Sequence, residues 1–271
     1  MCLNAGDLLQ ALVQQLPLNS PTLVELTGGD GEVNVLERLL ETAVPEKLTE
    51  RDMTLGEGRM TAALELLEIL LLQLGGYGCV PPIDEKEDRN PNEVLANHTS
   101  LLNILKSKNK LDLLTAHMKC DICKSWEYKN QSDTVVPRLG MSRLKMARAV
   151  EGMILLAHPE VDELIASSGV LEGCFDLFFK FEWCSLLHQS VANLLVHIIE
   201  GGSKREGLQV KVVNECGLLG RLLDCFKADD SPEDSGRIGK LGYMGHVIII
   251  CQAIVHACSD EEEEEVRLSE E

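Results

Sequence analysis

Apolar residues recur along this chain at the spacing of one face of an α-helix. In the stretch GRMTAALELLEILLLQLGG the apolar positions step by four and three residues through Met60, Leu64, Leu67, Leu71 and Leu74. Such steps place side chains on one face of a helix with 3.6 residues per turn. The double glycine that follows is a typical helix stop. The pattern therefore predicts a long amphipathic helix over this stretch.

A second stretch, LLHQSVANLLVHIIEGG, has the same pattern and the same double glycine. Its apolar positions are Leu187, Val191, Leu194 and Ile198. Each long helix follows a shorter apolar helix and a polar loop, and this plan occurs about four times along the chain. The paired stretches are 31–44 with 58–76, 98–119 with 138–159, 168–181 with 186–202, and 216–230 with 242–258.

Repeated helix pairs predict an all-α protein, because strand signals are almost absent. One pair cannot bury its own apolar face, so neighbouring pairs must stack, and we expect a right-handed α-solenoid of armadillo- or HEAT-like repeats. This single helical-repeat domain should span 1–258. We expect flexible loops at 75–97, 124–137 and 228–241, where turn formers and charges concentrate, and a disordered acidic tail at 259–271.

Composition narrows the class of protein. The 271 residues are 45% hydrophobic but only 4% aromatic, which favours helix-on-helix packing. The net charge of −19 argues against a nucleic-acid partner. The longest apolar run contains Glu65 and Glu68 and is about half a membrane span, which argues against membrane insertion. No secretory leader is visible at the start, so we expect a cytoplasmic protein, with the nucleus as a second compartment.

The stretch LLHQSVANLLVHIIEGG contains two histidines and begins two residues after a cysteine, Cys184. These side chains raise the question of whether the protein has a catalytic or metal site. His188 and His197 are nine residues apart, which is a half turn net, so the two histidines cannot share a metal. Cys184 with His188 would need a pocket and an oxyanion hole, and no nearby Gly-rich turn supplies one. His188 and His246 open the long helices of two successive pairs. We therefore expect a partly buried imidazole that hydrogen-bonds a neighbouring group, with direct partner contact as the alternative.

A CxxC motif, Cys120 and Cys123, follows His117 and invites the same test. A closed zinc site needs four ligands, and no second CxxC or histidine pair is evident. The glycine-rich stretches GGDGEV and GYGCV lack the Lys-Ser/Thr of a phosphate-binding loop. No set of catalytic side chains can be assembled in one pocket. We predict a non-enzymatic protein without metal or cofactor.

Four blocks in the second half carry a resemblance to a known family. In order they are Leu139-Gly140 with Arg143-Leu144, Leu177-Phe178-Phe179 followed by Trp183, Leu187-His188 with Val191, and Gly242 with Met244-Gly245-His246. Each block is weak alone, but the ordered set is fairly specific. Over 136–257 the chain resembles the SAPS-domain family, the regulatory subunits of protein phosphatase 6-type Ser/Thr phosphatases.

The resemblance implies a regulatory or scaffold subunit that binds such a catalytic subunit and regulates its activity or targeting. Other scaffold subunits are further expected partners. The alternative is a helical-repeat adaptor with a different partner. Candidate partner-contact or family-motif residues are Arg138, Arg143, Trp183, Leu187, His188, Tyr243 and His246.

Two groups of these side chains have open interpretations. Arg138, Arg143, Lys145 and Arg148 form a basic island that either offsets nearby acids or meets an acidic partner. In the turn FEW, we place Phe181 in the core. Trp183 either closes the repeat or anchors a partner.

Overall fold

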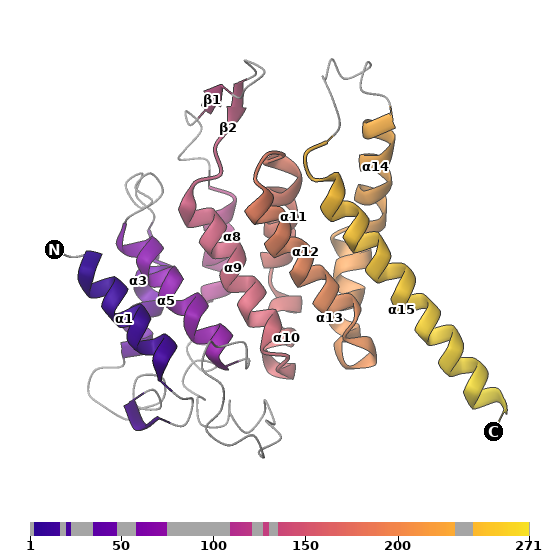
Figure 1. Cartoon of the computed structure of the whole chain (residues 1–271), viewed down its shortest axis with the longest axis horizontal. Coiled ribbons are helices and arrows are strands. Elements are labelled where there is room, and N and C mark those ends of the chain that lie inside the picture. The colour runs from indigo at the N-terminus through magenta and orange to yellow at the C-terminus, as the bar shows by residue number, and fades with distance from the viewer. Residues whose placement is uncertain are drawn as a thin grey trace.

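The computed structural model describes residues 3–16, 20–22, 35–47, 58–74, 109–120, 127–129, 135–230 and 241–270, and in these parts the protein is almost entirely helical (Figure 1). Five of its helices form one row in which each helix contacts the next. The row consists of α1 (Leu3–Gln15), α5 (Arg59–Leu74), α9 (Met141–Leu155), α12 (Ser185–Ile199) and α15 (Met244–Glu270).

Four other helices form a second layer behind this row. The helix α3 packs on α5, and α8 packs on α11. The members of this layer are α3 (Val35–Ala43), α8 (Lys110–Met118), α11 (Val170–Lys180) and α14 (Leu218–Asp230). Within the described residues, each predicted short and long stretch contains a helix. The prediction of an all-α protein is therefore confirmed.

The apolar stripes that predicted the long helices form the core. All five stripe residues of α5 are at most 3% exposed, and the four of α12 are at most 1% exposed. These residues belong to one continuous hydrophobic cluster that runs through both layers. The stripes of successive long helices are therefore buried against each other and against the shorter helices.

Two short segments between the pairs are helical although no repeat predicts them. The helix α10 (Pro159–Ser167) begins with a proline at its first turn, where the missing N–H costs nothing. After α12 the chain forms a 3₁₀ turn η1 (Gly202–Arg205), α13 (Glu206–Val210) and a π-helical turn η2 (Lys211–Glu215). These segments carry the chain between the layers.

The expected flexible loop at 124–137 contains the described strands. β1 (Glu127–Lys129) and β2 (Val135–Pro137) pair antiparallel, with Tyr128 opposite Val136. Aromatic and β-branched residues favour a paired, half-buried strand, which explains the departure. The expected loop at 75–97 lies outside the described residues. So does most of the one at 228–241, whose first residues, 228–230, belong to α14.

The acidic end also differs from the expected disordered tail, because α15 continues to Glu270. The packed first half of α15 already supplies the helix nucleus. Glutamate is a good helix former, so each added residue extends the helix at little cost.

A close approach between α5 and α9 gives a first testable prediction. A Cβ added at Gly152 would lie 3.0 Å from the Cβ of Leu71. We expect Gly152→Val to lower the free energy of unfolding by about 1–3 kcal/mol, because overpacking forces the helices apart. Urea unfolding measures the loss.

The control is Gly207→Val in α13, where nothing lies within 4 Å of the added Cβ. Glycine and valine differ little in helix propensity, so this variant should unfold close to the unmodified protein. Equal losses for the two variants would contradict the close approach.

Candidate partner-binding site

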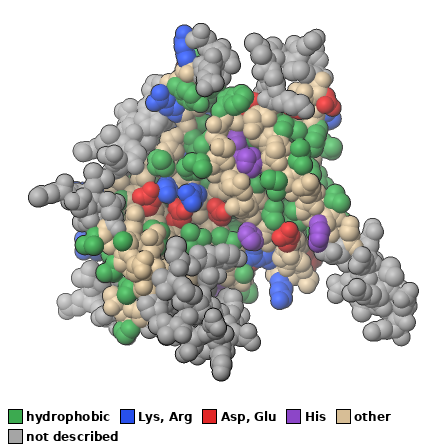
Figure 2. Space-filling model, viewed as in Figure 1, with side chains coloured by type: hydrophobic (Ala, Val, Ile, Leu, Met, Phe, Trp, Pro, Cys, Tyr) green, Lys and Arg blue, Asp and Glu red, His purple; other side chains and the backbone are tan. Residues whose placement is uncertain are grey.

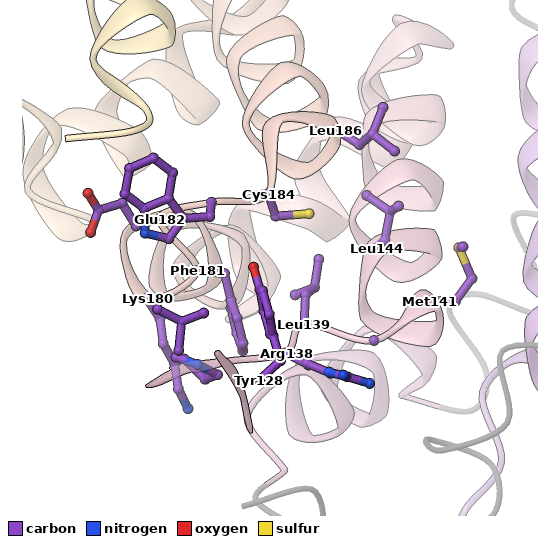
Figure 3. A pocket seen from close by; sticks show the side chains of 14 residues that line it. Tyr128, Arg138, Leu139, Met141, Leu144, Lys180, Phe181, Glu182, Cys184 and Leu186 are labelled. Carbon is purple, nitrogen blue, oxygen red and sulfur yellow. The ribbon is translucent and has the colours of Figure 1, made fainter. Parts of the chain in front are cut away.

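A groove of about 550 Å³ opens where the β-hairpin, the start of α9 and the turn between α11 and α12 meet (Figure 3). Leu139, Leu144 and Phe181 are buried and form its apolar floor. Trp183 and Leu186 lie on its rim and are 54% and 62% exposed. Large apolar side chains therefore line the groove from the floor to the solvent.

The turn that carries Trp183 is fixed by Gly242, which lies just before α15. The backbone N–H of Gly242 donates to Glu182 Oε1 at 3.2 Å. A Cβ at Gly242 would lie 2.6 Å from the carbonyl oxygen of Glu182 and 3.1 Å from the indole of Trp183. Only glycine allows this approach, so Trp183 is exposed but held in place.

Two cations and the carboxylate of Glu182 line the groove, and both cations lie near aromatic rings. The guanidinium of Arg138 is 5.5 Å from the ring centroid of Tyr128, and the ammonium of Lys180 is 5.6 Å from that of Phe181. In the part of the chain that the structure describes, no carboxylate pairs with Arg138. Arg138 thus presents an uncompensated positive charge at the rim.

The rest of the basic island has internal partners. Arg143 is buried, donates to the carbonyl oxygen of Cys120 at 2.6 Å and lies 5.6 Å from the ring of Phe181. Lys145 contacts both Glu65 and Glu68, at 3.1 Å and 3.2 Å. These charges lie over α5 and α9, where Figure 2 shows basic and acidic side chains together. Arg148 Nε lies 2.8 Å from Glu68 Oε1, so for Lys145 and Arg148 the structure favours the first interpretation, that they offset nearby acids, whereas the partner of Arg143 is a backbone carbonyl.

A cluster of rings lies behind the groove. His188 is 0% exposed, and because a carbonyl can only accept, its Nε2–H donates to the Phe178 oxygen at 3.1 Å. Its ring centroid is 4.8 Å from that of Phe178, 5.4 Å from Tyr243 and 5.6 Å from His246. The predicted imidazole-to-neighbour hydrogen bond is confirmed, and the ring is fully rather than partly buried.

Burial sets the charge of these histidines. It lowers the pKa of His188 to about 4, and the nearby His246 adds to this effect. Burial also lowers the pKa of His246. Neutral rings pack as aromatic side chains, so at neutral pH His188 joins two helix pairs without carrying a charge.

The candidate residues therefore separate into two groups. Arg138 and Trp183 line the groove. Leu187, His188 and Tyr243 are buried, and His246 is half-buried. The side chains of Leu187, His188 and Tyr243 are therefore not accessible to a partner in this structure.

The described residues offer little that could serve as a nucleophile or metal site. The His188 imidazole bonds Phe178 and not Cys184, whose carbonyl accepts the His188 backbone N–H at 3.1 Å. Burial raises the pKa of the Cys174 and Cys216 thiols to about 12 and about 11, the opposite of what activates a thiol. No group of three or more His, Cys, Asp or Glu could hold a metal in the parts described. Cys123 lies outside them.

A second apolar surface, which we call the α14 face, was not predicted. It consists of Leu219, Leu223 and Phe226, all exposed. Each lies one residue after a buried position of the same helix, at Leu218, Leu222 and Cys225. The apolar surface of α14 is therefore wider than the side that packs on the rest of the protein. The adjacent apolar pairs in the sequence LLGRLLDCF indicate this wide apolar surface.

A further set of exposed apolar residues lies on α15. Ile248, Ile249 and Val255 are exposed there, whereas Val247 and Ile250 are buried. Figure 2 shows hydrophobic side chains gathered over this end of the molecule. The described structure is thus an all-α protein whose exposed features are an apolar groove and an apolar helix face.

Comparison with known proteins connects this structure to one family. Residues 159–270 match the family model described as SIT4 phosphatase-associated protein, SAPS. The predicted resemblance to the SAPS family is confirmed over this segment, which contains the ring cluster and the α14 face.

Several curated relatives are serine/threonine-protein phosphatase 6 regulatory subunits. Subunit 3-A of Xenopus laevis is 24% identical over 135 residues, which cover 45% of this chain and 16% of the relative. Subunit 3 of Gallus gallus is 26% identical over 136 residues, covering 45% and 15%. Subunit 2 of Homo sapiens is 21% identical over 151 residues, covering 43% and 16%. The chain thus matches about a sixth of the length of these relatives.

Two further comparisons add facts about the fold. No solved structure matches this chain. Among the described residues, no helix has the length and apolar character needed to cross a membrane.

Proposed function

We propose that this protein is a regulatory subunit that binds a protein phosphatase 6-type catalytic subunit and regulates its activity or targeting. The observation that carries the proposal is the match of residues 159–270 to the SAPS family. The relatives are named as regulatory subunits of phosphatase 6. The protein itself acts without catalysis, and the phosphatase chemistry belongs to the partner.

We propose that the helix pairs form an armadillo- or HEAT-like solenoid within one domain over 1–258. The ordered contacts along the row from α1 to α15, and the second layer behind it, support this arrangement. A stack of helix pairs presents a long rigid surface, which suits a scaffold that holds other subunits. We place it in the cytoplasm, with the nucleus as a second compartment.

The α14 face is the proposed contact surface for the catalytic subunit. It lies inside the matched segment, and nothing in the described structure covers it. Exposed leucine and phenylalanine side chains on one helix face are typical of protein contact surfaces. Their burial by a partner would remove apolar area from water.

Purified full-length protein and a phosphatase 6-type catalytic subunit test the proposal by isothermal titration calorimetry. We expect a one-to-one complex that the double variant Leu219→Ser, Leu223→Ser weakens at least tenfold. Both side chains are exposed, so their loss should leave the circular dichroism spectrum and melting temperature nearly unchanged.

The matched control is Lys227→Gln on the same helix, whose side chain is 76% exposed. It should bind within about twofold of the unmodified protein, since surface charges contribute little.

Absence of any complex would contradict the proposed function. Recovery of a different dominant partner from native extract would favour the adaptor alternative. A complex that the leucine variant leaves intact would move the contact away from the α14 face.

A further inference from the structure

The groove combines three features that together define what it can hold. Its floor is apolar, its rim carries a fixed and exposed indole, and its charged lining has two cations, Arg138 and Lys180, against one carboxylate, Glu182, although the whole protein is strongly acidic. We propose that the groove is a docking site for a short extended segment of a partner protein, in which a large apolar side chain stands next to carboxylates. The proposal goes beyond the phosphatase contact and does not depend on it.

The apolar requirement follows from the floor and the rim. Leu139, Leu144 and Phe181 form a buried base, while Trp183 and Leu186 rise on the exposed side. An aliphatic or aromatic side chain that binds between the floor and the rim would be removed from water on both of its faces. Tryptophan dominates many protein interfaces because its large surface is ordered at low entropic cost. The Gly242 contact has already ordered Trp183.

The acidic requirement follows from Arg138 and Lys180. Both cations lie within 6 Å of a ring that lines the groove, so a carboxylate on a bound segment could approach them over the aromatic surface. Arg138 has no carboxylate partner in the described structure, and its planar guanidinium can hold one through two hydrogen bonds. Glu182, the one carboxylate of the lining, forms no ion pair with Arg138, and acids beyond about 10 Å are screened by salt, so the local balance stays positive.

The backbone around the groove favours an extended segment. Tyr128 and Val136 are cross-strand partners, and both line the groove from the hairpin. The opposite wall is the turn between α11 and α12. A slot between a hairpin face and a helix turn is lined on two sides and has an exposed rim, which suits a single extended chain. A nucleic acid would need many more cations than the groove provides.

Selection from a random dodecapeptide display library on the immobilised full-length protein tests the proposal. We expect enriched peptides that share one large apolar residue with Asp or Glu within a few positions. A fluorescein-labelled peptide of the enriched sequence should bind in an anisotropy titration, and its affinity should fall as salt rises.

Two variants and one control locate the site. Trp183→Ala and Arg138→Glu should each weaken the peptide at least tenfold. A peptide whose acids are changed to lysines should bind Arg138→Glu better than the unmodified protein. Lys129→Glu makes the same charge change on the hairpin at a residue that does not line the groove, and should alter binding less than twofold.

Three results would overturn the proposal. They are an absence of enriched peptides, an enriched sequence that is basic, and binding that neither groove variant changes. The assay contains no phosphatase, so its failure is distinct from failure of the proposed catalytic-subunit contact. Circular dichroism melting of each variant shows whether the fold is retained.

Discussion

Replacing Arg205 with methionine should lower the free energy of unfolding by about 3–5 kcal/mol at pH 7, among the largest effects expected of one substitution here. The Arg205 side chain is 7% exposed, and its Nε lies 3.2 Å from Asp162 Oδ2. Its other nitrogens donate to the carbonyl oxygens of His197 and Ile154. The guanidinium therefore ties α9, α10 and α12 together. Methionine would leave the Asp162 carboxylate buried without its partner.

Proton uptake by Asp162 gives this prediction a pH signature. Burial raises the pKa of Asp162 to about 6, although Arg205 opposes the shift. Without the arginine that pKa should rise further, so the carboxyl would be neutral at pH 5. We therefore expect the loss caused by Arg205→Met to be smaller at pH 5 than at pH 7, as measured by urea unfolding.

A double variant separates two causes of the lost stability: the missing charge partner of Asp162 and the missing packing of the Arg205 side chain. Arg205→Met with Asp162→Leu removes both charges and should recover much of the loss, since an apolar pair can replace a buried ion pair. A loss below about 1 kcal/mol for the single variant, or no recovery in the double variant, would show that the pair does not hold α10 in place.

Acid should weaken the fold through His188 between about pH 6.5 and pH 4. Burial holds the pKa of His188 in the folded protein at about 4, below the ordinary histidine pKa of about 6.5, so the unfolded chain takes up the proton first. The stabilising contribution is fully present above pH 6.5 and is lost as the pH falls toward 4. The difference of about 2.5 pKa units corresponds to about 3 kcal/mol.

His188→Gln isolates this contribution because glutamine can donate to the Phe178 oxygen but does not titrate. At pH 7 the variant should be less stable than the unmodified protein, since it lacks the ring contacts. The stability difference between the two proteins should shrink by about 3 kcal/mol as the pH falls to 4. Asp162 titrates in both proteins and largely cancels. A difference that stays constant with pH would contradict the buried, neutral His188.

The helices were predictable because their apolar residues repeat at helical spacing. The stripe from Met60 to Leu74 and the stripe from Leu187 to Ile198 are both buried. The paired strands at 127–129 and 135–137 were not predicted, because three-residue strands are too short to show an alternating pattern. The helical continuation of α15 to Glu270 was also not predicted, since charge pattern alone suggested a solvated tail.

The candidate site was predictable only in part. Sequence comparison selected His188 and Tyr243 together with Trp183, but it could not show that the first two are buried and the third is exposed. That separation depends on how successive pairs stack, and in particular on Gly242. The groove joins segments from 128 to 186, and no local pattern connects them. The α14 face, in contrast, was readable as an apolar stripe too wide for one buried side.

The contact at Gly242 joins two parts of the molecule thermodynamically. Gly242 touches Trp183 on the groove rim, and the next residue, Tyr243, packs against the His188 ring. A segment bound in the groove holds Trp183 in the position that this packing requires, so it binds the folded state and stabilises it by RT ln(1 + [L]/Kd). Linkage is reciprocal, so protonation of His188, which loosens the same packing, should weaken the bound segment. The groove is therefore expected to release its ligand only near pH 4, where His188 of the folded protein takes up its proton.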